Sequence, residues 1–324
     1  PMLFKNVCLY RMDEPLAFAG EVLETRLNAA GYTPCTRTEL QSSGFAPVLD
    51  NGDSRLAYGN GQALMLRLRE ETKLLPASVI RETVDEQVAR IEQQDGRKVR
   101  KRERDRIKDE VIFDLLPRAF SRSRSTWGYI DGPGRWLFVD AATRNRAEVF
   151  TERLRDAVTR LPIAPPRVQQ APQDVMTGWI ASGRVPPDFS LGEECVLADP
   201  NREGAEVRCK RQDLASPEIA AHLQAGKQVV RLSLLWNDRL SFLLDADFSL
   251  KRIRFPDLAD DERDDADETP EARFDGDFAL MQLEFSGLFE RLVQLFGGLV
   301  DGPGRAVTPA SKADPVNLSP PAAV

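Results

Sequence analysis

Hydrophobic and polar positions in the first part of the chain alternate between the period of a strand and the period of a helix. Residues 2–11 are apolar and rich in β-forming side chains, and residues 62–69 show partial alternation, so both predict strands. Apolar residues at helical spacing predict a helix over roughly 15–31, with Asp13 as its cap. The segment 32–61 is rich in Gly, Ser, Thr and Pro, which is typical of short strands and loops.

A longer helical pattern begins at Pro76. Apolar residues recur along one side of it until Pro117, which should end the helix because proline disfavours a helix interior. Gly96 lies in the middle of the pattern and predicts a break. We therefore expect two consecutive helices, near 77–94 and 97–116.

The pattern after these helices predicts a mixture of short strands and helices. Two β-rich runs joined by the Asp-Gly-Pro-Gly turn at 131–134 predict a hairpin, and Thr143 is the expected cap of a helix over 143–160. A later run of three β-rich segments is typical of an antiparallel meander. The further elements expected are helices near 173–182, 216–225 and 275–297, a strand at 205–211, and the meander segments 229–236, 239–246 and 249–255.

Helices and antiparallel strands in this mixture predict an α+β fold. The segment 161–172 holds four prolines in twelve residues and is the expected domain boundary. The predicted regions are an N-terminal α+β region over 1–165 that includes a basic helical extension at 76–124, a C-terminal α+β region over 166–300, and a disordered tail over 301–324.

The charge of the chain is unevenly spread. The 324 residues include 44 Lys and Arg against 51 Asp and Glu, a formal net charge of −7 that would argue against a simple polycationic nucleic-acid binder. However, residues 257–277 carry eleven acids and two bases, whereas the first 256 residues have a net charge of +3. Within them, residues 97–124 hold eleven bases and five acids. The sequence therefore predicts a basic body and a separate acidic strip at 257–277.

The basic segment is the strongest candidate for contact with a polyanion. Four-residue spacing would align Lys98, Arg102 and Arg106 on one face of a helix. Cations this dense repel one another unless anions screen them, and the phosphates of DNA are the obvious polyanion. The alternative is a solvated helix whose cations pair with nearby acids. The candidate DNA contacts are Arg97, Lys98, Arg100, Lys101, Arg102, Arg104, Arg106 and Lys108, with Arg118 further along the segment.

Most catalytic, metal-binding and base-reading motifs are missing. There is no GxxxxGK[ST] phosphate loop, and the sole histidine, His222, has no neighbouring nucleophile, which argues against a hydrolase triad. Cys8, Cys35, Cys195 and Cys209 contain no CxxC pair, so we expect reduced thiols and no metal or cofactor. No stretch approaches the roughly 18 apolar residues of a membrane helix, and the opening residues lack a signal-peptide pattern. We therefore expect a cytoplasmic protein without a membrane partner, and any DNA binding should be sequence-neutral.

The acidic strip leaves three interpretations open. A dense run of Asp and Glu is most often a solvated loop. Its carboxylates could instead hold Mg²⁺, which would make the protein a metal-dependent nuclease. As a third alternative, the strip could dock on a basic partner as an acidic protein-interaction module.

The stretch LLPRAFSRS at 115–123 resembles the RdgC family of bacterial recombination-associated proteins. The resemblance extends over nearly the whole chain up to about residue 298, and it rests on family-specific stretches rather than generic motifs. The other matching stretches are 2–12, 74–92, 210–236, 250–255 and 273–281.

The resemblance implies a protein that is not an enzyme and that binds DNA without sequence preference. It implies a crescent-shaped monomer that closes as a ring-shaped homodimer around double-stranded DNA, with single-stranded DNA as an additional candidate ligand. It also implies a nucleoid-associated protein that restrains the recombinase RecA by limiting its access to DNA. A ring lined with cations would gain affinity from counterion release and would need no base contacts.

The resemblance also points to individual residues. Phe120 resembles the family's apolar contact at one dimer interface, the gate where the ring is expected to open. Lys210, Arg211 and Gln212 in KRQD, and Lys227 in AGKQVV, resemble positions associated with that gate or with DNA. From the residues alone, Phe120 would be interpreted as a core aromatic side chain after a helix stop, and the three cations as solvated surface.

Overall fold

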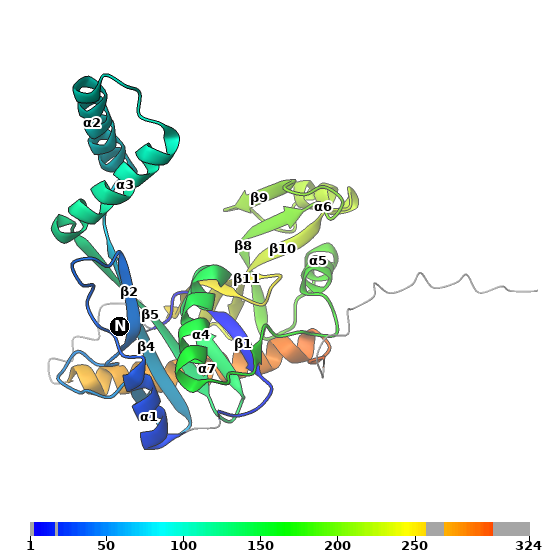
Figure 1. The fold of residues 1–324 in the computed structure, drawn as a ribbon. Coiled ribbons are helices and arrows are strands. Elements are labelled where there is room, and N and C mark those ends of the chain that lie inside the picture. Colours follow the sequence, from blue (N-terminus) through cyan, green and yellow to red (C-terminus); the bar gives the residue numbers. More distant parts are fainter. Residues whose placement is uncertain (1–2, 17–18, 257–268, 301–324) are drawn as a thin grey trace, which may run out of the picture.

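The computed structural model describes residues 3–16, 19–256 and 269–300, and these residues form seven α-helices and two antiparallel sheets (Figure 1). The predicted α+β fold is therefore confirmed for this part of the chain.

The first sheet is built mainly from strands of the N-terminal half. It contains β1 (Cys8–Met12), β2 (Gln41–Ala46), β3 (Ala57–Gly59), β4 (Ala63–Lys73), β5 (Ser121–Asp131), β6 (Trp136–Val139) and β7 (Ile163–Ala164). The strand order is β2-β4-β5-β6-β1-β7, and β3 pairs with β4 outside this path. The longest pairing joins β4 to β5, from Ala63 opposite Asp131 to Lys73 opposite Ser121. β5 and β6 are the predicted hairpin.

The second sheet contains β8 (Phe189–Ala198), β9 (Glu206–Lys210), β10 (Gln228–Trp236), β11 (Leu240–Asp245) and β12 (Leu250–Arg254). Its order is β12-β11-β10-β8-β9, so the predicted meander is confirmed as β10, β11 and β12. β8 is a strand that the sequence pattern did not predict. The two sheets are joined because Val7 and Leu250 exchange backbone hydrogen bonds of 2.8 and 2.9 Å.

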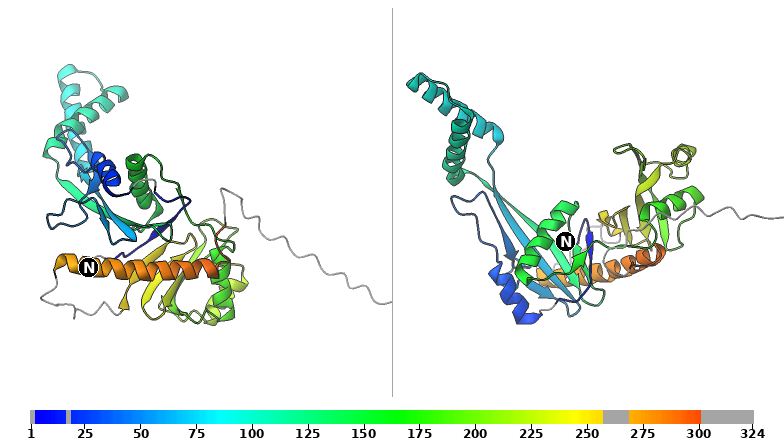
Figure 2. Two further views of the ribbon diagram at one scale, coloured as in Figure 1. Left: turned by 90° about the horizontal axis from the view of Figure 1, so that it is seen from below. Right: turned by 45° about the vertical axis from the view of Figure 1, so that its right-hand side comes forward.

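Helices cover both faces of the first sheet. The seven helices of the described residues are α1 (Gly20–Ala29), α2 (Ala77–Asp95), α3 (Lys101–Leu115), α4 (Arg144–Val158), α5 (Pro172–Ser182), α6 (Pro217–Gln224) and α7 (Pro270–Leu295), and three of them, α1, α4 and α7, cover this sheet. α1 and α4 pack on one face, where Leu27 and Phe150 are fully buried. α7 packs on the opposite face and continues along the second sheet (Figure 2).

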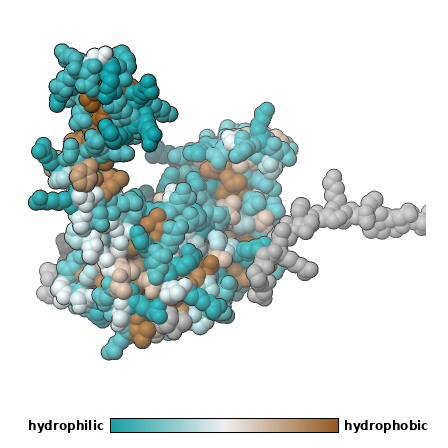
Figure 3. Space-filling view, in the orientation of Figure 1, coloured by the Kyte–Doolittle hydropathy of each residue, from teal (hydrophilic) through white to brown (hydrophobic). Residues whose placement is uncertain are grey.

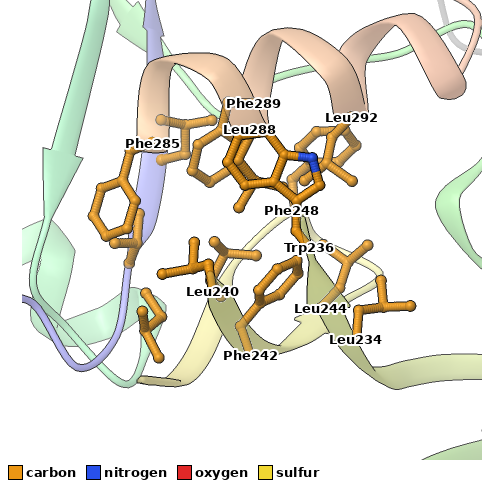
Figure 4. Close-up of a cluster of buried hydrophobic side chains, with 14 of the residues drawn as sticks. Leu234, Trp236, Leu240, Phe242, Leu244, Phe248, Phe285, Leu288, Phe289 and Leu292 are labelled. Atoms are coloured by element: carbon orange, nitrogen blue, oxygen red, sulfur yellow. The ribbon is translucent and has the colours of Figure 1, made fainter. Parts of the chain in front are cut away.

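α7 joins the two sheets into one hydrophobic core. Phe285 and Phe289 contact Phe138 of the first sheet, with ring centroids 5.9 and 5.5 Å apart. The same face of the helix packs on the second sheet (Figure 4). The side chains in that contact are Phe285, Leu288, Phe289 and Leu292 of α7 with Trp236, Leu240, Phe242, Leu244 and Phe248.

α2 and α3 form a helical hairpin that projects from β4 and β5 (Figure 1). Gly96 ends α2 with a φ of 64°, the left-handed conformation that glycine adopts most easily, so the predicted break is confirmed. The hairpin has a small core of its own, formed by Val84, Ile107 and Val111. The two sheets joined by α7 form the base of the molecule. A second projection, formed by β8, β9 and α6, rises from this base on the side opposite the hairpin (Figures 1 and 2).

Several predicted boundaries are changed by tertiary contacts. The helix expected over 15–31 begins only at Gly20, and Asp13 does not cap it. The Asp13 amide instead donates to the carbonyl oxygen of Pro162 at 3.0 Å, which keeps this segment extended. The last helix begins at Pro270, earlier than expected. Thr143 caps α4 as predicted, because its hydroxyl accepts from the Arg146 amide at 3.4 Å.

The domain boundary at 161–172 remains a prediction. The tail over 301–324 and residues 257–268 of the acidic strip lie outside the described residues. Among the residues that are described, no helix is long and apolar enough to cross a membrane.

Candidate nucleic-acid interface

The cations of the basic segment lie on the surface of the α2–α3 hairpin. All eight between 97 and 108 are exposed, and the hairpin surface is largely hydrophilic in Figure 3. α3 begins at Lys101, so Arg97 and Lys98 lie in the connection between the two helices. The predicted alignment is therefore wrong for Lys98, whereas Arg102 and Arg106 lie four residues apart on α3 as predicted.

Four of the eight cations are already paired within the hairpin. Each lies in ion-pair range of a carboxylate on α2 or α3. The pairs are Arg97 with Glu103 (2.7 Å), Lys98 with Glu92 (2.9 Å), Arg106 with Glu110 (3.5 Å), and Arg104 with Asp85. The alternative of a solvated helix with paired cations therefore applies to half of the basic segment.

The pairs in the connection between the helices shift the acid–base equilibria of their members. Hydrogen bonds from Arg97 lower the pKa of Glu103, and the hydrogen bond from Lys98 lowers the pKa of Glu92. The same contacts raise the pKa values of Arg97 and Lys98. All four groups are therefore charged at neutral pH, but the pairs are open to solvent and add little stability.

The other four cations, Arg100, Lys101, Arg102 and Lys108, form no ion pair within the described part of the chain. Three of them, Arg100, Lys101 and Arg102, follow one another at the beginning of α3. Arg100 is the N-cap residue, and its side chain has no acceptor for the free amides of the first helical turn. A helix N-terminus carries a partial positive charge, so these cations are repelled by the helix as well as by one another. Phosphates would relieve both repulsions.

Two further cations, Arg122 and Arg124, were not singled out from the sequence. Both are exposed on β5 and form no ion pair among the described residues. Residues two apart on a strand point to the same side, so the alternation SRSRS at 121–125 was the available signal. Arg118 is also exposed and ends a short 3₁₀ turn before β5. Cations without an ion pair therefore occur along the chain from the hairpin through the 3₁₀ turn into β5.

Phe120 lies at the foot of the hairpin with 84 % of its surface exposed. Its interpretation as a core aromatic side chain is therefore wrong for the single chain. The Phe120 carbonyl oxygen accepts from the Leu74 amide at 2.7 Å, and Leu74 is itself 48 % exposed. Phe113 of α3 is a further exposed aromatic residue of the hairpin. Exposed apolar side chains gathered on one projection are typical of a contact surface.

The second set of candidate residues flanks α6 on the other projection. Lys210 ends β9, Arg211 and Gln212 lead towards α6, and Lys227 lies between α6 and β10. Arg211 has a φ of 53°, and the Gln212 amide donates to the carbonyl oxygen of Glu193 at 3.3 Å. Lys227 is half-buried and the other three are exposed. The three cations form no ion pair with any described residue.

A single chain does not bring the two sets of candidate residues together. The basic segment is on the α2–α3 hairpin, whereas the KRQ residues and Lys227 are on the projection of β9 and α6 (Figures 1 and 2). Three other arginines of the second sheet are paired: Arg208 with Glu206 at 3.0 Å, Arg252 with Glu194 at 2.7 Å, and Arg231 with Asp245. Both projections therefore present cations that have no acidic partner, next to cations that have one.

The described residues contain no group of three or more His, Cys, Asp and Glu that could hold a metal ion.

His222 is half-exposed on α6. Burial raises the pKa of the Cys8 thiol to about 11 and that of Cys195 to about 12, which makes both poor nucleophiles. The carboxylates at 257–268 lie outside the described residues, so the nuclease alternative for the acidic strip is not tested by this geometry.

Comparison with known proteins gives consistent matches over most of the chain. The family model described as "RdgC: Putative exonuclease, RdgC" matches residues 2–299. The chain is 47 % identical over 298 residues to "Recombination-associated protein RdgC" of Halorhodospira halophila, a match that covers 92 % of this chain and 98 % of the relative. The protein of the same name from Pseudomonas fluorescens is 43 % identical over 300 residues, again covering 92 % and 98 %. That from Proteus mirabilis is 39 % identical over 297 residues, covering 91 % and 98 %.

Proposed function

The chain belongs to the RdgC family of recombination-associated proteins, and on this premise we propose that it binds DNA through the phosphate backbone without reading its sequence. The observation that supports this proposal is the set of cations without acidic partners on two projections of one chain, all of them exposed except the half-buried Lys227. The set comprises Arg100, Lys101, Arg102, Lys108, Arg118, Lys210, Arg211 and Lys227, with Arg122 and Arg124 on β5. Phosphate contacts fix position and supply affinity but carry no sequence information.

The proposed active form is a homodimer that closes as a ring around double-stranded DNA. Each chain has two projections on either side of a base, so a two-fold partner could meet it at both ends and enclose a central hole. The exposed Phe120 at the foot of the hairpin is the proposed apolar contact at the gate where this ring opens. Lys210, Arg211, Gln212 and Lys227 then lie on the other projection, as DNA or gate contacts.

The proposed effect on recombination is occlusion. A protein that encloses duplex DNA in the cytoplasmic nucleoid would limit the access of RecA to it without any catalytic step. Single-stranded DNA presents the same phosphates, and the same cations would bind it with a shallower salt dependence.

Salt dependence of DNA binding tests the backbone-directed mode. The affinity for short duplexes of unrelated sequence would be measured by fluorescence anisotropy from about 50 to about 500 mM salt. We expect a steep linear fall of log affinity with log salt and nearly equal values for all sequences. A flat plot, or a strong preference for one sequence, would contradict the proposal.

A matched pair of variants tests which cations bind. In the first, Arg100, Lys101 and Arg102 are replaced by Gln; in the second, the ion-paired Arg153, Arg160 and Arg208 are replaced by Gln. Both variants carry three fewer positive charges. We expect the salt slope of the first to fall by roughly 0.9 for each phosphate that it no longer binds, and the slope of the second to change little. Equal reductions of the slope in both variants would show that only total charge matters.

The second candidate function is a metal-dependent nuclease; the matching family model is described as an exonuclease, which favours nuclease activity but names no metal. The test is prolonged incubation of linear and closed circular plasmid with the protein and Mg²⁺. Cleavage that disappears in a variant with Asp264→Asn and Asp265→Asn would support the nuclease. DNA that stays intact with the unmodified protein, and that the variant binds with unchanged affinity, supports the binding protein.

A further inference from the structure

A cavity of about 600 Å³ lies between the turn that joins β5 to β6 and the C-terminal half of α7. None of the candidate DNA contacts lines it. Trp136, Val293 and Leu299 supply apolar wall, and Asp131 and Glu290 supply carboxylates. Asp131 begins the Asp-Gly-Pro-Gly turn that the sequence pattern singled out.

The Asp131 carboxylate is the most unusual group in this cavity. Asp131 is only 3 % exposed, yet its side-chain hydrogen bonds are long, 3.5 Å from Gln282 Nε2 and 3.4 Å from Ser286 Oγ. Gln282 is held in this orientation because its Oε1 accepts from Asn60 Nδ2 at 2.7 Å. Burial raises the pKa of Asp131, and the hydrogen bonds from Gln282, Ser286 and the Gly134 amide only partly offset this effect.

No described Lys or Arg forms an ion pair with Asp131. Arg11 lines the same cavity, but its guanidinium lies 4.7 Å from the Trp136 ring centroid and donates to the carbonyl oxygens of Gly134 and Arg135. Buried carboxylates are normally paired with a cation or fully hydrogen-bonded. Asp131 therefore faces a cavity with three hydrogen-bond donors around it but no cation to balance its charge.

We propose that this cavity binds a small organic cation, an ammonium or guanidinium group on an apolar stem, with Asp131 as its anionic partner. An ionised carboxylate offers about four acceptor positions, and the long contacts from Gln282 and Ser286 leave room for a stronger donor. A guanidinium can engage a carboxylate through two parallel hydrogen bonds. The apolar walls at Trp136, Val293 and Leu299 would hold the stem and keep water away, which strengthens the charge contact.

The same chemistry could come from a free amine or from a lysine or arginine side chain of a peptide. The charged groups that line the cavity besides Asp131 are Arg11 of β1 and Glu290 of α7. Arg11 is engaged with carbonyl oxygens, and Glu290 is exposed, so only Asp131 combines burial with negative charge. Binding should therefore weaken as the pH falls and Asp131 takes up a proton.

The test uses the full-length protein and three probes in isothermal titration calorimetry at pH 8. The probes are n-butylguanidinium as the free cation, N-acetyl-arginine N-methylamide as the side-chain form, and n-butylurea as the uncharged control. The first protein variant is Asp131→Asn, whose side-chain oxygen can still accept from the Gly134 amide in the turn. The control is Asp156→Asn, which removes one exposed negative charge on α4. Val293→Trp, which fills the cavity and leaves Asp131 in place, is the second cavity variant.

We expect saturable binding of at least one cation at one site per chain, at least roughly tenfold weaker in Asp131→Asn and unchanged in Asp156→Asn. Val293→Trp should also remove it, which tests the cavity independently if Asp131→Asn folds poorly. Binding of N-acetyl-arginine N-methylamide alone would assign the site to an arginine side chain of a peptide. Binding of both cations would show that the site also accepts a small free cation. Absent binding of both cations, equal binding of n-butylurea, or equal affinity in Asp131→Asn would overturn the proposal.

Discussion

At the scale of single residues, the cations of the hairpin differ in whether a carboxylate already holds them. Arg102 and Arg104 are both exposed, but only Arg104 is paired, with Asp85, which is 19 residues away along the chain. The density of cations in the hairpin could be predicted from the sequence, because it follows from counting the Lys and Arg residues of the segment. Their pairing could not, because it depends on how α2 and α3 close on each other. The exposure of Phe120 was likewise not predictable from its local pattern.

Replacement of Phe120 by Ser tests its role as a contact residue. Phe120 is 84 % exposed, so its loss should change the free energy of unfolding of the monomer by less than about 0.5 kcal/mol. A buried Phe would cost about 3–5 kcal/mol when truncated. We expect weaker dimerisation in analytical ultracentrifugation and faster loss of the protein from closed circular DNA. Leu283→Ser, at a 69 % exposed position on α7, is the control and should leave both properties unchanged.

Glu71 of β4 gives a prediction on pH. Hydrogen bonds from the Ser121 hydroxyl, the Tyr32 hydroxyl and the Cys35 amide lower its pKa to about 2. The Tyr32 and Cys35 contacts are 2.7 and 3.0 Å long. A depressed carboxyl pKa stabilises the fold above the ordinary value of about 4.3, and this contribution is lost as the pH falls towards the native pKa.

Glu71→Gln should therefore lower the free energy of unfolding at pH 7 by about 1 kcal/mol, since the site is open to solvent. The difference from the unmodified protein should shrink as the pH falls from about 4 to about 2. Urea unfolding at a series of pH values measures it. A difference that stays constant down to pH 2 would contradict the role assigned to the charge.

At the scale of elements, the sequence pattern succeeds where local signals suffice and fails where tertiary contacts decide. The break at Gly96 and the cap at Thr143 are local and were predicted. β8 was missed because its pairing with β10 contains two register shifts, which disrupt the alternation of the strand. Gly192 also leaves one position of β8 without a side chain, and glycine is needed there because a Cβ would collide with Ser233 of the neighbouring strand.

The α2–α3 hairpin should behave as a separate cooperative unit. Its core is separate from the two larger clusters and has only three buried side chains, Val84, Ile107 and Val111, with five partly buried apolar residues packed against them. Truncation of a buried Ile typically costs about 2–5 kcal/mol, and a small separate core opens at a lower free energy than the whole protein. We expect Ile107→Ala to open the hairpin locally, to weaken DNA binding and to leave the body folded.

Limited proteolysis and hydrogen exchange measure this local opening. In Ile107→Ala, cleavage and exchange should rise within 77–118 and stay unchanged in the sheets. Leu234→Ala, at a 1 % exposed position on β10, is the comparison and should lower the melting temperature of the whole protein. Equal global destabilisation by both variants would show that the hairpin is not independent.

At the scale of the whole molecule, α7 explains why the two sheets act as one base for both projections. Its apolar side chains reach Phe138 in one sheet and Phe242 in the other, so neither sheet can shift alone without exposing this core. The resemblance predicted the family over nearly the whole chain, and the family match over residues 2–299 confirms it. Composition alone would have misled, because the net charge of −7 combines a basic body with the acidic strip.

The acidic strip yields a prediction for the whole molecule. Residues 259–268 hold seven acids and one base, and replacement of the acids by Asn or Gln keeps the length of the connection between Pro256 and Thr269. The change brings the formal net charge of the chain from −7 to zero. If DNA is bound by the cations of the two projections, removal of this repulsion should leave the affinity for duplex unchanged or raise it, most clearly at low salt.

Fluorescence anisotropy with duplex DNA measures the affinity, and circular dichroism checks that the variant is folded. Abolished DNA binding in a folded variant would assign the contact to the acidic strip and favour a protein-interaction module. Abolished cleavage in the presence of Mg²⁺ would favour the nuclease. Unchanged or tighter binding by the variant, together with no cleavage by the unmodified protein, would show that DNA binding does not need the acidic strip and would support DNA contact at the cationic projections.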